Sequence, residues 1–409
     1  MLLHAATVPP PLSPIIVVPG LGGSVLEAKL DGAPPFRDCE TSSDWFTLWA
    51  SLTQGLTRYA CFDRNMELVL DNTTGLVRNA TGVSMRPRDF GGTGGIEYSN
   101  AGAGGEPHIA YMHALVSALE NVGYVAGVSL RAATSDFRGV GLPQILAEQY
   151  ARLRQLIEDT VALNGGRQVH LLSHSLGGPY TTLFLAEAEA AWKSRYVRSF
   201  ISLSAPIMGT AVALEGVISG PMYDWIPQFL PELLVPSIRT FPSIAWMFPR
   251  AHEDANVWGE NFTFVSTPSH NYSLGGLRSL VDALNATVIS HSWDAVEQRT
   301  ARSASDPGVP VLCVYANDTR TDLSIRVPDD TFASKGVRTS STMGDGTVNL
   351  PSLEACSRWA QVAVRPVRFG GSLAAHTEIV RSPEVIKMII DWATATEATT
   401  ELVETGQRK

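Results

Sequence analysis

The sequence predicts an α/β fold in which a mostly parallel sheet is covered by helices on both faces. Two observations predict it: short apolar runs that are typical of buried parallel strands, and helical patterns that lie between several of them. The chain has 409 residues, of which 44% are hydrophobic, and this is ample for one large core with insertions.

The first strand pattern is Ile15–Val18, an IIVV run that ends in the glycine-rich turn PGLGG at 19–23. Further strands are expected at 124–128, 169–172, 197–203, 311–315 and 362–369. Helical patterns lie at 108–121, 143–163, 176–190 and 383–395. Because strands and helices alternate in this way, a parallel sheet is favoured over an antiparallel one.

Two regions depart from this alternation. Residues 31–105 contain polar, glycine-rich and aromatic-rich pieces, and residues 208–300 are rich in Pro, Trp, Met and Phe. We expect both regions to be insertions on the core and not independent domains, so that residues 1–409 form a single domain.

The charge balance excludes several classes of partner. The formal net charge is −9 and no basic run is present, which argues against nucleic-acid binding. No stretch reaches the roughly 18 consecutive apolar residues of a membrane helix. The chain is therefore not expected to span a bilayer, and contact with lipid would require apolar side chains. Residues 1–8 are too short for a complete secretory signal peptide.

The asparagines indicate a secretory history. Six of the twelve lie in Asn-x-Ser/Thr sequons, whereas chance predicts roughly two. We therefore expect glycan acceptors at Asn72, Asn79, Asn261, Asn271, Asn285 and Asn317.

The even number of cysteines agrees with that history. Cys39, Cys61, Cys313 and Cys356 could form two disulfides with three possible connectivities, or remain four buried thiols in a cytosolic enzyme. The sequons favour disulfides. No pair has CxxC spacing, so no zinc site is expected.

The strongest motif is VHLLSHSLGG at 169–178. An apolar strand runs into Ser173-His-Ser-Leu-Gly177 and a helical pattern follows, which is the nucleophile elbow with its first glycine replaced by serine. The sharp turn requires small flanking residues and presents the Ser175 hydroxyl at a helix N-terminus. An ordinary serine in a tight strand–helix turn is the alternative.

A serine nucleophile needs a base, and the base needs an orienting acid. In α/β-hydrolases the acid follows the serine and the histidine comes last. Only one of the nine histidines, His376, lies beyond the best acid candidate, Asp345, which glycines flank. Taken singly, Asp345 could be a turn residue and His376 an ordinary histidine. Their order favours a triad with Ser175, and His174 is expected to have a packing role.

The oxyanion formed during acyl transfer needs preorganised donors. We expect the backbone N–H of Leu176, directly after the nucleophile, and the N–H of Leu21 in the PGLGG turn. The alternative is that these glycines only shape the turn.

At these residues the sequence resembles the lecithin–cholesterol acyltransferase family, which includes lysosomal phospholipase A and plant lecithin–cholesterol acyltransferase-like proteins. The resemblance covers roughly residues 15–395, with LLSHSLGG and GDGTVNL similar to the plant-type members. Further matching motifs are VVPGLGGSVLEAKLD, RAATSDFR, SLSAP, WMFP, STPSHNY and AAHTEIV.

The resemblance implies an α/β-hydrolase core with the triad Ser175, Asp345 and His376 and the oxyanion donors Leu21 and Leu176. It implies the disulfides Cys39–Cys61 and Cys313–Cys356. It also implies a cap or lid, which we place at 208–300, and a membrane-binding loop at 39–61.

The loop at 39–61 contains a stripe of large apolar residues. On a helix, Trp45, Leu48, Trp49 and Leu52 would share one face. Tryptophan suits the bilayer interface, so Trp45 and Trp49 are the expected membrane contacts. The alternative is that this stripe packs on the core.

The resulting hypothesis is a serine enzyme that moves a fatty acyl chain from a glycerophospholipid to a lipid hydroxyl, such as a sterol, or to water. No metal or organic cofactor is expected. The expected partners are a lipid substrate and a phospholipid membrane or lipoprotein-like surface, with peripheral attachment in the secretory pathway: secreted, lysosomal or vacuolar, or in the ER lumen. The alternatives are a carboxylesterase for soluble esters and a catalytically silent lipid-binding hydrolase fold.

Overall fold

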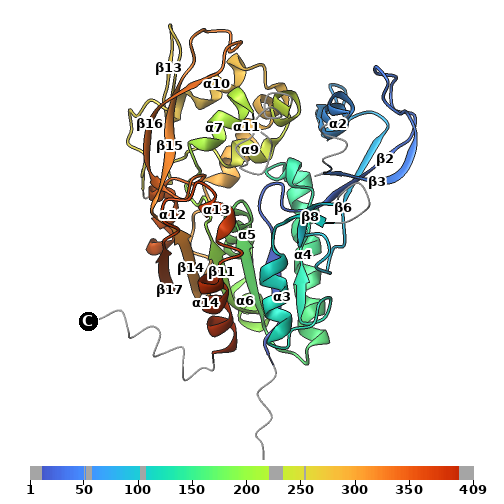
Figure 1. Cartoon of the computed structure of the whole chain (residues 1–409), viewed down its shortest axis with the longest axis vertical. Helices are drawn as coiled ribbons and strands as arrows, with labels where there is room; N and C mark the ends of the chain where they lie inside the picture. Colours follow the sequence, from blue (N-terminus) through green and yellow to red (C-terminus); the bar gives the residue numbers. More distant parts are fainter. Residues whose placement is uncertain are drawn as a thin grey trace, which may run out of the picture.

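The computed structural model of the chain describes residues 12–49, 51, 58–101, 107–220, 234–252 and 255–395 (Figure 1). The expectations for residues 1–8 and for Leu52 fall outside these ranges. Within the described residues, no helix is both long and apolar enough to cross a bilayer.

The centre of the molecule is a six-stranded sheet in which all neighbouring strands are parallel. In sheet order, its strands are β17 (Val362–Val367), β14 (Val311–Ala316), β11 (Val197–Leu203), β10 (Val169–His174), β1 (Ile15–Val18) and β9 (Leu130–Ala132). The strands β10 and β1 are neighbours, so the loops that follow them meet at one edge of the sheet.

Side chains alternate between the two faces of this sheet, as the period of a strand requires. On one face, Ile15 and Val17 pack with α3 (His113–Asn121) and α14 (Pro383–Thr394). On the other face, Ile16 and Val18 pack with α4 (Pro143–Leu163), α5 (Gly177–Glu187) and α6 (Ala190–Tyr196). Because both faces are covered, β1 is buried at every position, and the expected α/β fold is confirmed.

One predicted strand is wrong. Residues 124–128 form a turn with only an isolated bridge from Ala126 to Leu130, and the edge strand is β9 instead. Gly123 and Gly127 have φ angles of 105° and 75°, which break an extended run, and Val125 is exposed. The predicted helix at 108–121 also begins later, because residues up to 110 belong to the strand β8 (Pro107–Ala110) and α3 starts at His113.

The part of the chain that follows the PGLGG turn forms a second sheet, which is antiparallel. It has the order β3 (Ser43–Trp49), β2 (Leu26–Leu30) and β6 (Val83–Pro87). The shared helical face considered for Trp45, Leu48 and Trp49 is therefore wrong, because these residues lie in a strand. Around this sheet lie α2 (Tyr59–Met66), β4 (Leu68–Leu70), β5 (Val77–Asn79), β7 (Tyr98–Ala101) and β8 (Pro107–Ala110).

Between β11 and β14 the chain makes a long excursion, here called the β11–β14 insertion (207–310). Figure 1 shows it above the central sheet. Its elements are α7 (Val212–Ser219), α8 (Val235–Ile238), α9 (Pro242–Trp246), β12 (Val265–Ser266), β13 (Asn271–Tyr272), η3 (Leu274–Gly276), α10 (Leu277–Ala283) and α11 (Thr287–Thr300). Its buried side chains are continuous with the core over α4 and α5.

A hairpin that the sequence analysis did not predict completes this upper part. The strands β15 (Thr319–Arg326) and β16 (Val337–Gly344) pair with each other and join β12 and β13 in a four-stranded sheet. The chain then returns through α12 (Leu350–Leu353) and η4 (Glu354–Arg358) to β17, and through α13 (Ala375–Glu378) to α14.

Candidate active site

Ser175 lies in the sharp turn between β10 and α5. Its φ is 54°, in the left-handed region that non-glycine residues rarely adopt, and its backbone N–H donates to the Leu203 carbonyl at 3.0 Å. The strain is localised at the residue whose hydroxyl the turn presents, as expected for a nucleophile elbow.

Close approach explains the small residues around the turn. A Cβ on Gly20 would lie 2.8 Å from the Ser175 Cβ, and one on Gly177 would lie 2.5 Å from the Val18 carbonyl oxygen. Ser173, which replaces the first glycine of the motif, is tolerated because its hydroxyl is buried in a hydrogen bond with Thr181 at 2.8 Å.

The three residues of the expected triad are brought together by loops far apart in the sequence. The Ser175 hydroxyl lies 2.9 Å from His376 Nε2, and His376 Nδ1 lies 2.8 Å from Asp345 Oδ2. In this arrangement the serine donates to Nε2 and the protonated Nδ1 donates to the carboxylate. The geometry is that of a nucleophile, base and orienting acid.

The acid is fixed by its own loop after β16. Asp345 is fully buried, and its other oxygen accepts backbone N–H bonds from Thr347 at 3.0 Å and Val348 at 2.6 Å. The Asp345 carbonyl also accepts the His376 backbone N–H at 3.0 Å. Since every side-chain acceptor points at a fixed donor, the carboxylate can hold the imidazole in one tautomer and orientation.

His174 has a larger part than the packing role expected for it. Its Nδ1 accepts from the Tyr111 hydroxyl at 2.7 Å, and its Nε2 donates to the His376 backbone carbonyl at 2.8 Å. Burial lowers the pKa of His174 to about 3, so the ring is neutral. Tyr111 also accepts the Gly20 backbone N–H at 3.2 Å. This chain of hydrogen bonds links the PGLGG turn to the backbone of His376. In the sequence, only the histidine between the two serines of the elbow indicated it.

The two expected oxyanion donors flank the nucleophile from different loops. Leu176 is the N-cap residue directly before α5, and Leu21 follows Gly20, whose backbone abuts Ser175. Within the described residues, neither the Leu21 nor the Leu176 backbone N–H has a hydrogen-bond acceptor. Free N–H groups beside a serine, one of them at the N-terminus of α5, are suited to stabilise developing negative charge.

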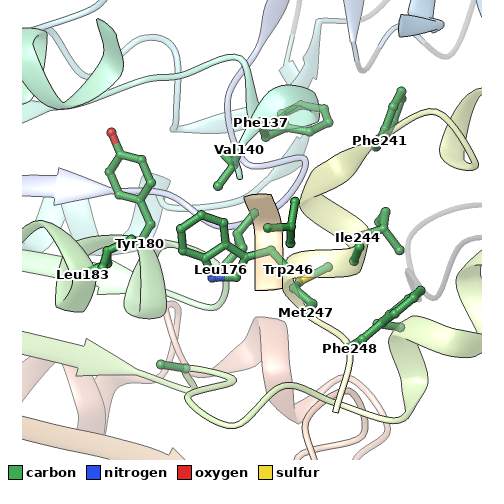
Figure 2. Close-up of a cluster of buried hydrophobic side chains, with 14 of the residues drawn as sticks. Phe137, Val140, Leu176, Tyr180, Leu183, Phe241, Ile244, Trp246, Met247 and Phe248 are labelled. Carbon is green, nitrogen blue, oxygen red and sulfur yellow. The ribbon is translucent and has the colours of Figure 1, made fainter. Parts of the chain in front are cut away.

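An apolar pocket opens beside the Leu21 turn. In this structure its volume is about 20 Å³, which is too small for an acyl chain unless the pocket walls move apart. Apart from Ser237 its lining is apolar or glycine: Leu21, Trp49, Phe62, Met66, Phe137, Gly216, Leu234, Ile238, Phe241 and Ile244. Figure 2 shows Leu176 and Trp246 in one cluster of buried hydrophobic side chains, together with Phe137, Phe241 and Ile244. Leu176 of the elbow therefore belongs to the same apolar cluster as Phe241 and Ile244, which line the pocket.

The two tryptophans expected to contact a membrane are in different environments. Trp49 is only 6% exposed, lines the apolar pocket and donates its indole N–H to the Gly22 carbonyl at 2.8 Å. It is therefore a core residue, and the expectation of membrane contact is wrong for it. Trp45 is 38% exposed and lies under the Arg86 guanidinium, 4.1 Å from the ring centroid.

Both disulfides have the connectivity implied by the resemblance. Cys39 is joined to Cys61, and Cys313 to Cys356. The first bond ties the segment before β3 to α2, and the second ties β14 to η4.

The six sequons differ in accessibility. The side chains of Asn72, Asn261, Asn271 and Asn285 are exposed, whereas Asn79 and Asn317 are half-buried. Asn79 also accepts from the buried Arg138 guanidinium at 2.6 Å through its amide oxygen.

A parallel sheet with a serine elbow, a histidine and an aspartate in hydrogen-bond contact defines a class, the α/β hydrolases with a catalytic triad. The particular family follows from comparison with known proteins. The family model described as lecithin:cholesterol acyltransferase matches residues 45–306. The chain belongs to this family, which confirms the resemblance and supports the expected lipid acyltransferase or phospholipase activity.

Individual relatives agree with this assignment. The human lysosomal phospholipase A and acyltransferase is 31% identical over 85% of this chain and 82% of its own length. The human phosphatidylcholine-sterol acyltransferase is 33% identical over 87% of this chain and 78% of its own. A chain in the crystal structure of the Tle4-Tli4 complex has the same fold, with a TM-score of 0.57 and 12% identity over 98% of this chain and 99% of that one.

Proposed function

We propose that the protein transfers a fatty acyl chain from a glycerophospholipid to a lipid hydroxyl or to water, with Ser175 as the nucleophile. The observation that carries this proposal is the hydrogen-bonded chain from Ser175 through His376 to Asp345, next to an apolar pocket. The printed names of the relatives, a phospholipase A and a phosphatidylcholine-sterol acyltransferase, support the same substrate class.

In the first step His376 takes the Ser175 proton at Nε2, and the serine oxygen attacks the ester carbonyl carbon. The carbonyl oxygen becomes negative and accepts hydrogen bonds from the free backbone N–H groups of Leu21 and Leu176. When the ester bond breaks, His376 gives its proton to the departing lysolipid oxygen. The acyl chain remains on Ser175, with the apolar pocket as its site.

In the second step an acceptor hydroxyl gives its proton to His376 and attacks the acyl carbonyl carbon. Ser175 leaves and recovers the proton. Water as acceptor gives a free fatty acid, and a sterol or similar alcohol gives a new ester. Exclusion of water from the pocket favours the second outcome.

The surface around the Cys39–Cys61 disulfide is the proposed membrane contact. Trp45 and Tyr59 in the segment closed by this bond, and Phe36 just before it, are all exposed, and exposed large apolar side chains that gather on one surface mark an interaction site. Tryptophan and tyrosine are suited to the headgroup layer. The segment 39–61 is thus the membrane-binding element, and the contact is peripheral.

Residues 208–300, the greater part of the β11–β14 insertion, are the proposed cap. They contribute Phe241 and Ile244 to the pocket, and their side chains continue the core above the elbow. A secretory location is supported by the two disulfides and by the four exposed sequons.

Purified protein incubated with phosphatidylcholine liposomes, with and without a sterol, tests the proposal. Lysolipid with free fatty acid or with sterol ester supports it and identifies the acceptor. Cleavage of only soluble short-chain esters would instead identify a carboxylesterase. Absence of any product, with lipid bound, would identify a silent lipid-binding fold.

A further inference from the structure

A second cavity lies on the side of α9 that faces away from the apolar pocket. Its volume is about 270 Å³, close to the lower end of small-molecule sites. The segment 241–250 separates the two spaces, because Phe241 and Ile244 line the pocket whereas Ala245 and Phe248 line the cavity. This cavity has no part in the mechanism described above.

The cavity is lined chiefly by hydrocarbon. Five large apolar side chains contribute: Phe248, Leu274, Leu277, Trp293 and Val296. Phe248 and Trp293 are in ring contact, with centroids 6.3 Å apart. A space with such walls favours an apolar chain over water.

One wall carries a cation without a counter-ion. Arg250 lines the cavity, and its guanidinium bonds only to backbone carbonyls: Trp246, Pro206 at 3.3 Å and Ile207 at 3.4 Å. Its Nε is buried without any hydrogen-bond partner, and within the described residues no carboxylate forms an ion pair with it.

The electrostatics agree with this geometry. Burial lowers the pKa of Arg250 to about 9, and no neighbouring acid raises it again. Glu297 also lines the cavity, but its side chain is exposed to solvent. The arginine is still protonated at neutral pH. Its side chain is partly buried, so the guanidinium loses some of its water without gaining a counter-ion, which an anion in the cavity would supply.

We infer that this cavity binds the carboxylate of a single-chain lipid, with the head group on Arg250 and the chain against Trp293 and its apolar neighbours. A carboxylate can accept charge-assisted hydrogen bonds from a guanidinium, and a hydrocarbon chain matches the remaining walls. That this ligand is a product of the enzyme rests on the proposed function, since hydrolysis releases a free fatty acid. Binding itself does not depend on catalysis.

The experiment uses full-length protein with Ser175→Ala, so that no turnover occurs. A fatty acid with bromine on its chain is titrated while tryptophan fluorescence is recorded, because bromine quenches an indole in contact with it. We expect saturable quenching, most of which is lost when Trp293→Phe is added. Butyrate and inorganic phosphate should compete at least about tenfold more weakly, since each buried methylene contributes to affinity.

Two further variants test the site independently. Arg250→Gln should weaken binding at least about tenfold, the loss expected for a charge-assisted bond, and Arg250→Lys should weaken it less. Gly275→Leu should also weaken binding, because this glycine lines the cavity and a Cβ there meets no atom within 4 Å, so a bulky side chain can be added at the wall without a clash at its Cβ. Arg302→Gln is the matched control, since this nearby exposed arginine pairs with Glu187 outside the cavity.

Unchanged quenching in both Arg250→Gln and Gly275→Leu would overturn the inference, because the acid would then bind elsewhere. Equal competition by phosphate or butyrate would also overturn it and indicate a small-anion site. If the wild-type protein cleaves no phospholipid but quenching of Trp293 persists, the proposed function fails and the cavity remains a fatty-acid site.

Discussion

Replacing the two tryptophans of β3 one at a time should separate binding to a membrane surface from the stability of the active site. Trp49 packs against Phe62 and Phe137 and holds the Gly22 carbonyl, so Trp49→Ala should cost about 3–5 kcal/mol of unfolding free energy for the lost packing. The lost hydrogen bond adds about 1 kcal/mol. Trp45→Ala should cost less than about 1 kcal/mol, because its main contact is an exposed cation–π pair.

The two variants should also differ in activity. Trp49→Ala should reduce hydrolysis of both liposomes and a soluble short-chain ester, because Trp49 supports the turn that carries Leu21. Trp45→Ala should spare the soluble ester and reduce liposome hydrolysis at least about tenfold, since burying an aromatic side chain is worth about 1.5–3 kcal/mol. Trp49→Phe is the control that keeps a ring but removes the N–H.

Urea unfolding gives the stabilities, and initial rates on the two substrates give the activities. The reasoning is refuted if Trp45→Ala lowers both activities together with stability, because Trp45 would then be a core residue. It is also refuted if Trp49→Ala leaves the soluble ester reaction and the unfolding free energy unchanged.

Three other outcomes are expected. Ser175→Ala should lower ester hydrolysis about 10⁴-fold or more while circular dichroism stays unchanged; retained turnover would refute the nucleophile. Tyr111→Phe leaves His174 Nδ1 without its donor and should lower kcat about tenfold with little change in KM; a change confined to KM would contradict a role behind the base. Burial raises the pKa of Asp63 in the folded protein above its unfolded value of about 4. The contribution of this group to the stability of the wild type is therefore fully present below the unfolded pKa and is lost as the pH rises through the folded pKa. Asp63→Asn, which keeps an acceptor for the Ser237 backbone N–H, should therefore unfold at higher urea than wild type at pH 7 and at nearly the same urea at pH 3; a gap at pH 3 as large as at pH 7 would contradict this.

The central part of the molecule could be read from the sequence because its signals are local. The apolar run Ile15–Val18 and the elbow around Ser175 each carry their own pattern of burial and small residues. Asp345 and His376 were placed by chain order and not by distance, and the structure puts them in hydrogen-bond contact with each other. The link from Tyr111 to His174 could not be foreseen, because it joins residues 63 positions apart.

In β3 the spacing of the large apolar residues fits a helix as well as a strand. Trp45 and Trp49 are four positions apart, a spacing that puts two residues on one face of a helix and also on one face of a strand. Pairing with β2 decides for the strand, and local bulges leave Trp45 exposed while Trp49 turns inward. A two-residue or four-residue spacing alone cannot reveal such a partner.

The hairpin β15–β16 was missed for a different reason. β16 reads VRTSSTMG and has no clear alternation of apolar and polar residues. β15 reads TRTDLSIR and does alternate, but it has only two strongly apolar residues, Leu323 and Ile325. Most of β16 is exposed or half-buried, and its stability comes from pairing with β15 and from an ion pair of Arg338 with Glu215. Strands held mainly by backbone pairing and surface charge leave little trace in hydropathy.

The Cys313–Cys356 disulfide constrains one residue of the triad and not the other two. Its partners are 43 positions apart, and Asp345 lies inside the ring of chain that they close, whereas Ser175 and His376 lie outside it. In the chain-entropy description, closing a ring of this length removes about 4 kcal/mol of freedom from the unfolded chain. The acid is therefore tethered to the sheet even when the hairpin before it opens transiently. Both cysteines are buried, so this tether on the acid is shielded from solvent, and Ser175 and His376 are positioned without it.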